Sequence, residues 1–429
     1  MAGALNLFQA TMLRWRSRHP YNAAHAARVA LPLDADKLRA TIATALAETG
    51  LTGFTLDARR GRYAWRGGPA TVALAVADPA SDVNEALREA IERSLERVFV
   101  SDGAYTPFAF EAIPDGAGFW LLVAYDHLVA GGDSAVTLRG GICAAYANGE
   151  TLPRLERHPP RFRRMVARHP LQVARALADM PRMALNARRA RRPPGLEIPT
   201  GVNAFVMAQL GPAVAEGVAR AAERFEATRN DVLMAALIRA VAGLKPPPSP
   251  GARRFEIAVA SVINIRSDCA APASQTFGQF LSSFRAAYPH PEEATLEAVV
   301  RAVHAESRDL RKRRRYLRSL IAIALSGIAW RVVRDARRDS IYGKHYPVWA
   351  GLTTLVVPGL WNALAPGADR APDAYRRGVS TGPLAPIVVA ATFTGSSLEL
   401  GVSFRPAAVP APDVHAVLAR LVASLEALS

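Results

Sequence analysis

Segments with the patterning of strands and of helices alternate along both halves of this 429-residue chain. In the first half, apolar runs or alternation predict strands at 23–31, 71–76, 108–113 and 119–125, with helices at 35–47 and 83–98. In the second half, strands are expected at 204–210, 255–265, 387–394 and 398–404, with helices at 213–224, 232–244 and 414–428. Residues 277–284 are expected to lead into a long crossover. This alternation predicts an α/β protein made of two α/β sandwiches.

A basic, proline-interrupted segment separates the two halves. Residues 151–193 hold twelve arginines and two acidic residues. We therefore place a first lobe at 1–175, a basic linker at 176–200 and a second lobe at 201–429.

The net charge of +16 is concentrated in that segment and in residues 308–338, which hold eleven Lys or Arg and two acidic residues. RNA, phospholipid headgroups or a phosphate-bearing cosubstrate would each suit such charge, and so would two solvated helix faces with no partner. The run 311–315, followed by the apolar residues 316–333, is typical of an interfacial helix on an anionic membrane or of a buried helix flanked by exposed arginines. Aromatic residues that would stack on nucleic-acid bases are not interleaved here, so nucleic acid is not the expected partner.

Several classes of protein are excluded. Cys143 and Cys269 are the two cysteines of the chain, so we expect neither a disulfide framework nor a metal site. The first residues do not have the pattern of a secretory signal, and the apolar stretch 319–330 is shorter than the roughly 20 residues that span a bilayer. We expect a cytoplasmic protein, with attachment to the inner membrane face left open.

His127 is the main candidate for chemistry. It ends the apolar strand that begins at Phe119 and precedes a glycine-rich turn, Gly131-Gly132-Asp133-Ser134. A strand end followed by a turn into a helix is where α/β proteins present reactive side chains. The position of His127 by itself is also compatible with a histidine that has only a structural role.

The segment Asp126-His127-Leu128-Val129-Ala130-Gly131-Gly132-Asp133-Ser134 resembles the HHxxxDGxS motif of the CoA-dependent acyltransferase superfamily, which includes peptide-synthetase condensation domains and wax ester synthases. Other segments resemble the family in the same order: Pro20–Asn22, Arg97–Phe99, Asn230–Leu237, Val262–Arg266, Phe277–Leu281 and Val379–Pro383. The resemblance therefore extends over nearly the whole chain.

This resemblance implies two chloramphenicol-acetyltransferase-like α/β sandwiches in a V-shaped pseudo-dimer, with His127 at their junction. It implies an acyltransferase of lipid or secondary-metabolite biosynthesis that binds no cofactor. The acyl group would pass from a thioester of CoA or an acyl-carrier protein to a hydroxyl or amine, with His127 as general base. Asn264, Ser380 and Thr381 are candidate contacts for the substrate or the oxyanion.

The motif also departs from the family. Asp126 replaces the first histidine, and Gly131 replaces an aspartate that in the family pairs with an arginine. The segment 51–55, where that arginine is expected, has none, so both members of the pair are absent together. Asp133 could partly replace the lost carboxylate, or the motif residues could simply shape the turn. A catalytically impaired protein that binds an assembly-line partner is the alternative reading.

Overall fold

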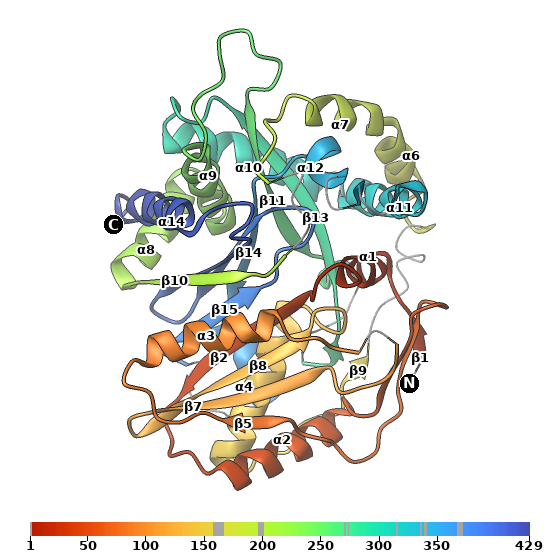
Figure 1. The fold of residues 1–429 in the computed structure, drawn as a ribbon, viewed down its shortest axis with the longest axis vertical. Coiled ribbons are helices and arrows are strands. Elements are labelled where there is room, and N and C mark those ends of the chain that lie inside the picture. The colour runs from red at the N-terminus through yellow and green to blue at the C-terminus, as the bar shows by residue number, and fades with distance from the viewer. Residues whose placement is uncertain are drawn as a thin grey trace.

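The computed structural model describes residues 2–100, 102–157, 167–195, 201–269, 272, 274–314, 316–334, 337–338, 341–366 and 372–429. Arg315 and part of the predicted linker, residues 196–200, lie outside these ranges. Figure 1 shows two lobes stacked along the long axis of the molecule. Each lobe is built on one large sheet with helices packed against it, which confirms the predicted α/β fold.

The N-terminal lobe contains a five-stranded sheet in the order β15-β2-β8-β7-β5. The bounds of its strands are β2 Asn22–Val29, β5 Leu74–Val76, β7 Phe108–Asp115, β8 Gly118–Asp126 and β15 Tyr375–Val379. Helices α2 (Ala35–Thr49) and α4 (Gly132–Asn148) share one core with the side chains of one sheet face, and α3 (Val83–Leu95) covers the other face. Successive residues of β8 alternate between these two cores, which buries the strand on both sides.

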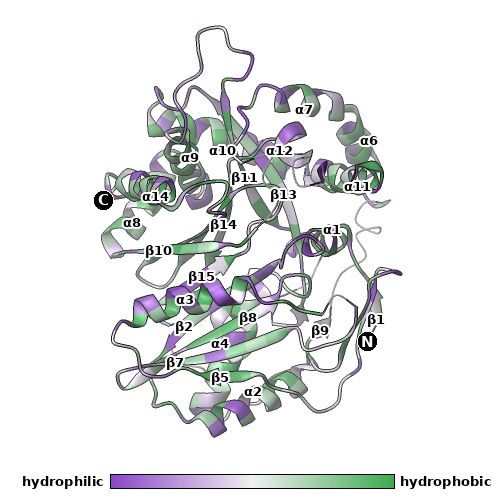
Figure 2. Cartoon of the chain, viewed as in Figure 1, coloured by the Kyte–Doolittle hydropathy of each residue, from purple (hydrophilic) through white to green (hydrophobic). Residues whose placement is uncertain are grey.

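The C-terminal lobe contains a six-stranded sheet in the order β10-β17-β16-β14-β11-β13. Its strands are β10 Ala204–Leu210, β11 Glu256–Asn264, β13 Leu281–Pro289, β14 Ala350–Val356, β16 Ile387–Phe393 and β17 Leu398–Phe404. One core joins this sheet to α8 (Pro212–Arg224), α9 (Arg229–Ala242), α10 (Leu296–Lys312) and α14 (Ala411–Glu426). In Figure 2 the strands are mainly apolar, whereas the helices carry alternating polar and apolar stripes.

Shorter elements complete the fold. A four-stranded sheet has the order β1-β4-β3-β6, and β9 pairs with β12 in parallel. Their bounds are β1 Ala2–Ala4, β3 Phe54–Asp57, β4 Arg62–Trp65, β6 Gly103–Ala104, β9 Glu156–Arg157 and β12 Thr276–Phe277. The remaining helices are α1 Leu7–Arg16, α6 Pro170–Ala178, α7 Met180–Ala187, α11 Tyr316–Val332, α12 Ile341–His345 and α13 Pro358–Trp361. None of the helices in the described ranges is long and apolar enough to cross a membrane.

Strand β15 joins the lobes, since it comes late in the chain yet pairs with β2 in the N-terminal sheet. Its backbone also lies directly against the C-terminal sheet. A Cβ added to Gly401 on β17 would lie only 2.0 Å from the carbonyl oxygen of Arg377, so β17 approaches β15 at a distance that only glycine allows. The sequence analysis predicted no strand at 375–379.

Most of the predicted elements are present, and the strand expected at 204–210 coincides with β10. Residues 277–284 do lead into a long connection, since α10, α11 and α12 come before β14, but the strand in this segment was not predicted. Residues Leu281–Pro289 form β13, which pairs antiparallel with β11. Its side chains alternate between buried and half-buried, with Phe284 and Ala286 in the C-terminal core. That alternation is the ordinary pattern of a strand.

Candidate functional site

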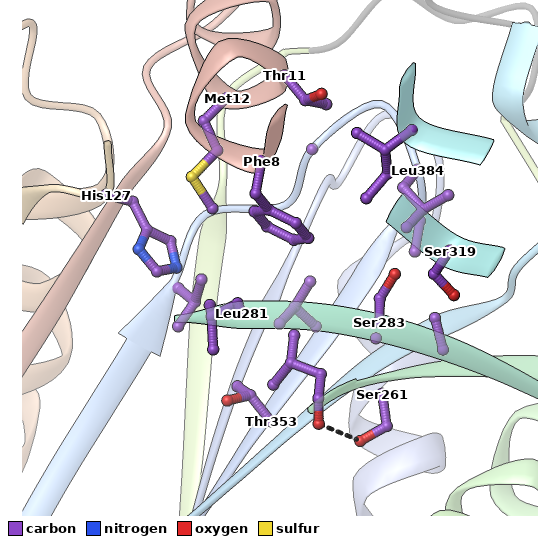
Figure 3. A pocket seen from close by; sticks show the side chains of 18 of the residues that line it. Phe8, Thr11, Met12, His127, Ser261, Leu281, Ser283, Ser319, Thr353 and Leu384 are labelled. Atoms are coloured by element: carbon purple, nitrogen blue, oxygen red, sulfur yellow. Dashed lines mark hydrogen bonds between the residues drawn. The ribbon is translucent and has the colours of Figure 1, made fainter. Parts of the chain in front are cut away.

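A cavity of about 590 Å³ lies where the two lobes meet. Its walls come from α1, the end of β8, the strands β11, β13 and β14, and the helices α7 and α11. Most of its surface is apolar, as the side chains Phe8, Met12, Leu281 and Leu384 in Figure 3 illustrate. A mainly apolar cavity with a few polar groups is typical of a small-molecule site.

His127 lines this cavity directly after β8. Its Nδ1 lies 2.9 Å from the carbonyl oxygen of Ala130. Because a carbonyl can only accept, Nδ1 carries the proton and Nε2 is left as an acceptor. The amide nitrogen of Gln279 donates to the backbone carbonyl of His127 and lies 3.3 Å from Nδ1, farther than the carbonyl oxygen of Ala130, which sets the tautomer. Figure 3 shows the imidazole directed toward the cavity between Met12 and Leu281.

Burial lowers the pKa of His127 to about 4, because the charged imidazolium would lose its solvation. The hydrogen bond to Ala130 opposes this shift in the pKa, whereas the positive charge of Arg377 adds to it. The ring is held between aromatic neighbours: Tyr21 stacks on it at 5.5 Å between centroids, and Tyr125 meets it edge-on at 5.9 Å. His127 is therefore an oriented, neutral imidazole that can accept a proton.

Asp126 points away from the cavity. It forms a buried ion pair with Arg16 of α1 and accepts a hydrogen bond from the hydroxyl of Tyr105 at 2.6 Å. Burial raises the pKa of Asp126, and the charge of Arg16 acts against that shift. Neighbouring residues on an extended strand face opposite sides, so Asp126 has no contact with the imidazole of His127.

Asp133 supplies the buried carboxylate that Gly131 lacks. Its Oδ2 accepts from Nε of Arg266 at 2.8 Å and from Nδ2 of Asn264 at 2.9 Å, so the turn after β8 is joined to the end of β11. The expectation that both the carboxylate and its arginine are missing is therefore corrected. The carboxylate stands two residues later in the motif, and the arginine comes from the C-terminal lobe and not from 51–55.

The other turn residues complete this junction. The hydroxyl of Ser134 accepts from Arg266 at 2.7 Å and donates to the carbonyl of Gly278 at 3.0 Å. A Cβ on Gly131 would lie 3.0 Å from Oδ1 of Asp133. At Gly132, which lines the cavity, a Cβ would lie 2.9 Å from the side chain of Leu355. The two glycines thus leave room for the ion pair and for the cavity.

Of the three candidate substrate contacts, only Asn264 lines the cavity, and its amide is bound to Asp133. Ser380 donates to the carbonyl of Leu95, and Thr381 donates to Asn203. Both hydroxyls are buried in these contacts and are not part of the cavity wall. The structure therefore does not place Ser380 or Thr381 where they could contact a substrate in this cavity.

Helix α11 separates the cavity from the exterior. Ser319, Ile323 and Ser326 of one face line the cavity. A different face carries the exposed side chains Leu325, Ile328 and Val332. The basic run 311–314 lies at the end of α10 and just beyond it.

Sequence reasoning missed Arg377 and Gln279 as site residues. Gln279 belongs to the FGQFL segment that carried part of the resemblance, so a signal for it existed. Arg377 lies in a strand that the sequence did not predict. Within the described residues, no cluster of His, Cys, Asp or Glu is arranged to hold a metal ion.

The Asp133–Arg266 pair gives a stability prediction. The exchange Asp133→Ala should lower the free energy of unfolding by about 3–5 kcal/mol, because it leaves a buried guanidinium without its carboxylate. The double exchange Asp133→Ala with Arg266→Met should recover much of that loss. Urea unfolding measures the free energy of unfolding of the single and the double variant. The matched control is Glu216→Ala, which removes the carboxylate of the exposed pair Glu216–Arg220. If Asp133→Ala costs no more than Glu216→Ala, the pair does not stabilise the junction.

No protein-family model matches the sequence, and no curated protein matches it either. Solved structures do. The first condensation domain of the calcium-dependent antibiotic synthetase, in complex with a substrate analogue, is similar with a TM-score of 0.71 at 17% identity, over 100% of this chain and 96% of that one. The condensation domain of the Monacolin K polyketide synthase gives 0.66 at 14% identity, over 100% and 97%. Trichothecene 15-O-acetyltransferase from Fusarium sporotrichioides gives 0.71 at 11% identity, over 99% and 95%. The chain therefore has the two-lobed fold of these condensation domains and of this acetyltransferase, and its motif around His127 resembles that of the CoA-dependent acyltransferase superfamily.

Proposed function

We propose that the protein is an acyltransferase that moves an acyl group from a CoA or acyl-carrier-protein thioester to a hydroxyl or amine acceptor. The observation that supports this most is the buried, neutral imidazole of His127, which borders the cavity between the lobes and whose Nε2 has no hydrogen-bond partner among the described residues. A protein that only bound its partner would have no need of a proton acceptor at that place.

In the proposed reaction, the acceptor's O–H or N–H donates to Nε2 of His127. The imidazole takes this proton as the oxygen or nitrogen attacks the thioester carbonyl carbon. The tetrahedral intermediate then expels the thiolate, which receives the proton back from Nε2. An ester or amide and a free thiol are the products, and the imidazole ends neutral.

The cavity wall favours an apolar acyl chain or acceptor. Phe8, Met12, Met183, Ile323 and Leu352 contribute to it from four different elements. Apolar side chains gain free energy when they cover an apolar ligand at roughly 25 cal/mol per Å². Such a lining is consistent with a role in lipid or secondary-metabolite biosynthesis.

The exchange His127→Ala should lower the rate of thiol release from an acyl-CoA in the presence of a medium-chain alcohol or amine by about 10²–10⁴-fold, because it removes the general base. Thiol release is followed with a chromogenic disulfide. The exchange His415→Ala, at an exposed position on α14, is the control and should leave the rate unchanged. Equal rates for His127→Ala and the wild type would exclude His127 as the base.

The pKa of His127 predicts a characteristic pH profile. With a pKa of about 4, the imidazole stays neutral from pH 8 down to 5, and kcat/KM should begin to fall only as the pH approaches 4. A solvated histidine base, with its pKa near 6.5, would instead lose roughly 30-fold between pH 8 and 5. Circular dichroism at each pH verifies that the protein is folded. An inflection near 6.5 would contradict the buried, neutral base.

We also propose that the outer face of α11, with the neighbouring α6 and α7, contacts an anionic membrane. Leu325, Ile328 and Val332 are 46%, 61% and 79% exposed and lie on one stripe of α11. Arg331 and Arg334, at and just beyond the end of α11, are exposed, as are Arg175 of α6, a helix that packs against α11, and Arg182 of α7. Exposed apolar side chains together with arginines are typical of a surface that binds a bilayer with anionic headgroups. Because α7 and α11 also line the cavity, an apolar substrate would have a short path from the membrane.

Vesicle flotation tests this surface. The wild type should float with phosphatidylserine-containing vesicles and not with phosphatidylcholine alone, and Ile328→Asp should lose that binding. Val98→Asp, at a position in the N-terminal lobe that is 83% exposed, is the matched control and should bind as the wild type does. Failure to float with either vesicle, or selective binding of an acidic carrier protein instead, would refute membrane contact.

A further inference from the structure

Arg377 is a buried cation in the cavity wall that has no acidic partner among the residues the structure describes. Its side chain is 2% exposed. Four other buried arginines pair with a carboxylate: Arg16 with Asp126, Arg191 with Glu292, Arg266 with Asp133 and Arg376 with Glu399. No such ion pair is formed by Arg377 within the described ranges. Burying an unpaired charge is costly, so a missing counter-charge here needs an explanation.

Neutral groups hold the guanidinium in place. Nε donates to the hydroxyl of Thr392 at 3.2 Å, and Nη1 donates to the hydroxyl of Thr353 at 3.1 Å. Nη2 donates to the carbonyls of Thr353 at 2.7 Å and Ala391 at 2.9 Å. These bonds use four of the five N–H groups of an arginine and leave one on Nη1. They orient the guanidinium without neutralising its charge.

The remaining N–H belongs to the atom that lies near the motif turn. A Cβ on Gly132 would lie 3.7 Å from Nη1 of Arg377 and 3.6 Å from the ring of His25, so the missing side chain keeps this corner of the cavity open. Both Arg377 and His127 line the cavity, and the positive charge of Arg377 lowers the pKa of His127.

No anion balances this corner among the described residues. His25 is neutral, because burial lowers its pKa well below the usual value. The hydroxyls of Tyr125 and Tyr375 bond to His25, and burial raises the pKa of both tyrosines, so neither supplies a negative charge. Asp133 is already bound to Arg266. The counter-charge is therefore expected to come from a ligand.

We propose that Arg377 binds a negatively charged oxygen of the reacting molecules. This inference rests on the proposed function for its chemical meaning. The anionic oxygen has two sources: the oxyanion that forms when the thioester carbonyl is attacked beside His127, or a carboxylate carried by the substrate. An oxyanion needs preorganised donors, and the two hydroxyls expected from the sequence, those of Ser380 and Thr381, are not in the cavity wall.

Ligand binding tests the proposal without requiring turnover. Octylphosphonate imitates a tetrahedral oxyanion, octanoate carries a planar carboxylate, and octanol has the same chain without a charge. Calorimetry should give a Kd for at least one of the two anions that is ten or more times lower than the Kd of octanol. Preference for octylphosphonate alone assigns the oxyanion role, and preference for octanoate assigns a substrate carboxylate.

The exchange Arg377→Met should remove this preference, and Arg377→Lys should keep part of it because the charge remains. Arg139→Met is the matched control, since Arg139 is also buried without a carboxylate partner in the described chain but does not line the cavity. Arg139→Met should keep the preference for the anion over octanol, as should any correctly folded variant of a residue that does not line the cavity. Thermal unfolding identifies variants that do not fold.

Two results would overturn the proposal: no preference for either anion in the wild type, or the same preference in Arg377→Met. Neither depends on turnover, so an inactive wild type with a clear Arg377-dependent preference would refute the proposed function and leave the anion site standing. Where turnover is measured, the oxyanion role further predicts that Arg377→Met lowers kcat by about 10²–10³-fold with little change in KM.

Discussion

The ion pair between Asp133 and Arg266 is the contact on which the arrangement of the site depends. It joins the turn that follows β8 in one lobe to the end of β11 in the other. Ser134 and Asn264 bond to the same two charged groups, so both charges are satisfied although water is excluded. With the turn held in this way, the carbonyl of Ala130 stays beside Nδ1 of His127 and selects the tautomer that leaves Nε2 for the cavity.

The buried arginines differ in whether a carboxylate pairs with them. The pairs Arg16–Asp126 and Arg376–Glu399 fasten elements of the fold, and the atoms that they occupy are not offered to the cavity. Arg377 differs because, in the described part of the chain, neutral oxygens and no carboxylate bind its guanidinium. A buried cation beside a neutral imidazole is the kind of electrostatic arrangement that stabilises developing negative charge. Burial and the positive charge of Arg377 both lower the pKa of His127, so the imidazole stays neutral.

Much of the fold could be predicted from local patterning. The predictions for β10, the β7–β8 hairpin and the helices α2 and α9 are correct. The apolar residues of these segments recur with the spacing of a strand or of a helix, or form an apolar run typical of a buried strand. Three strands of the two large sheets were not predicted: β13, β14 and β15. In β13, serines and an arginine break the apolar alternation, and β15 has two arginines in five residues. β15 pairs with β2, which is distant in sequence, and β14 lies between β11 and β16, whereas β13 pairs with β11, the preceding strand of the same sheet.

For the site, the sequence alone determined the strand, the histidine at its end and the glycine turn into α4, because these are consecutive residues whose geometry follows from local rules. It also supplied the ordered segments that indicated the superfamily. The tertiary structure decided which charges meet. Arg16, Arg266 and Arg377 reach the motif from α1, the end of β11 and β15, and all three lie more than a hundred residues from it in the sequence. Sequence spacing does not predict such contacts, because they form only when the two lobes pack together and β15 joins the N-terminal sheet.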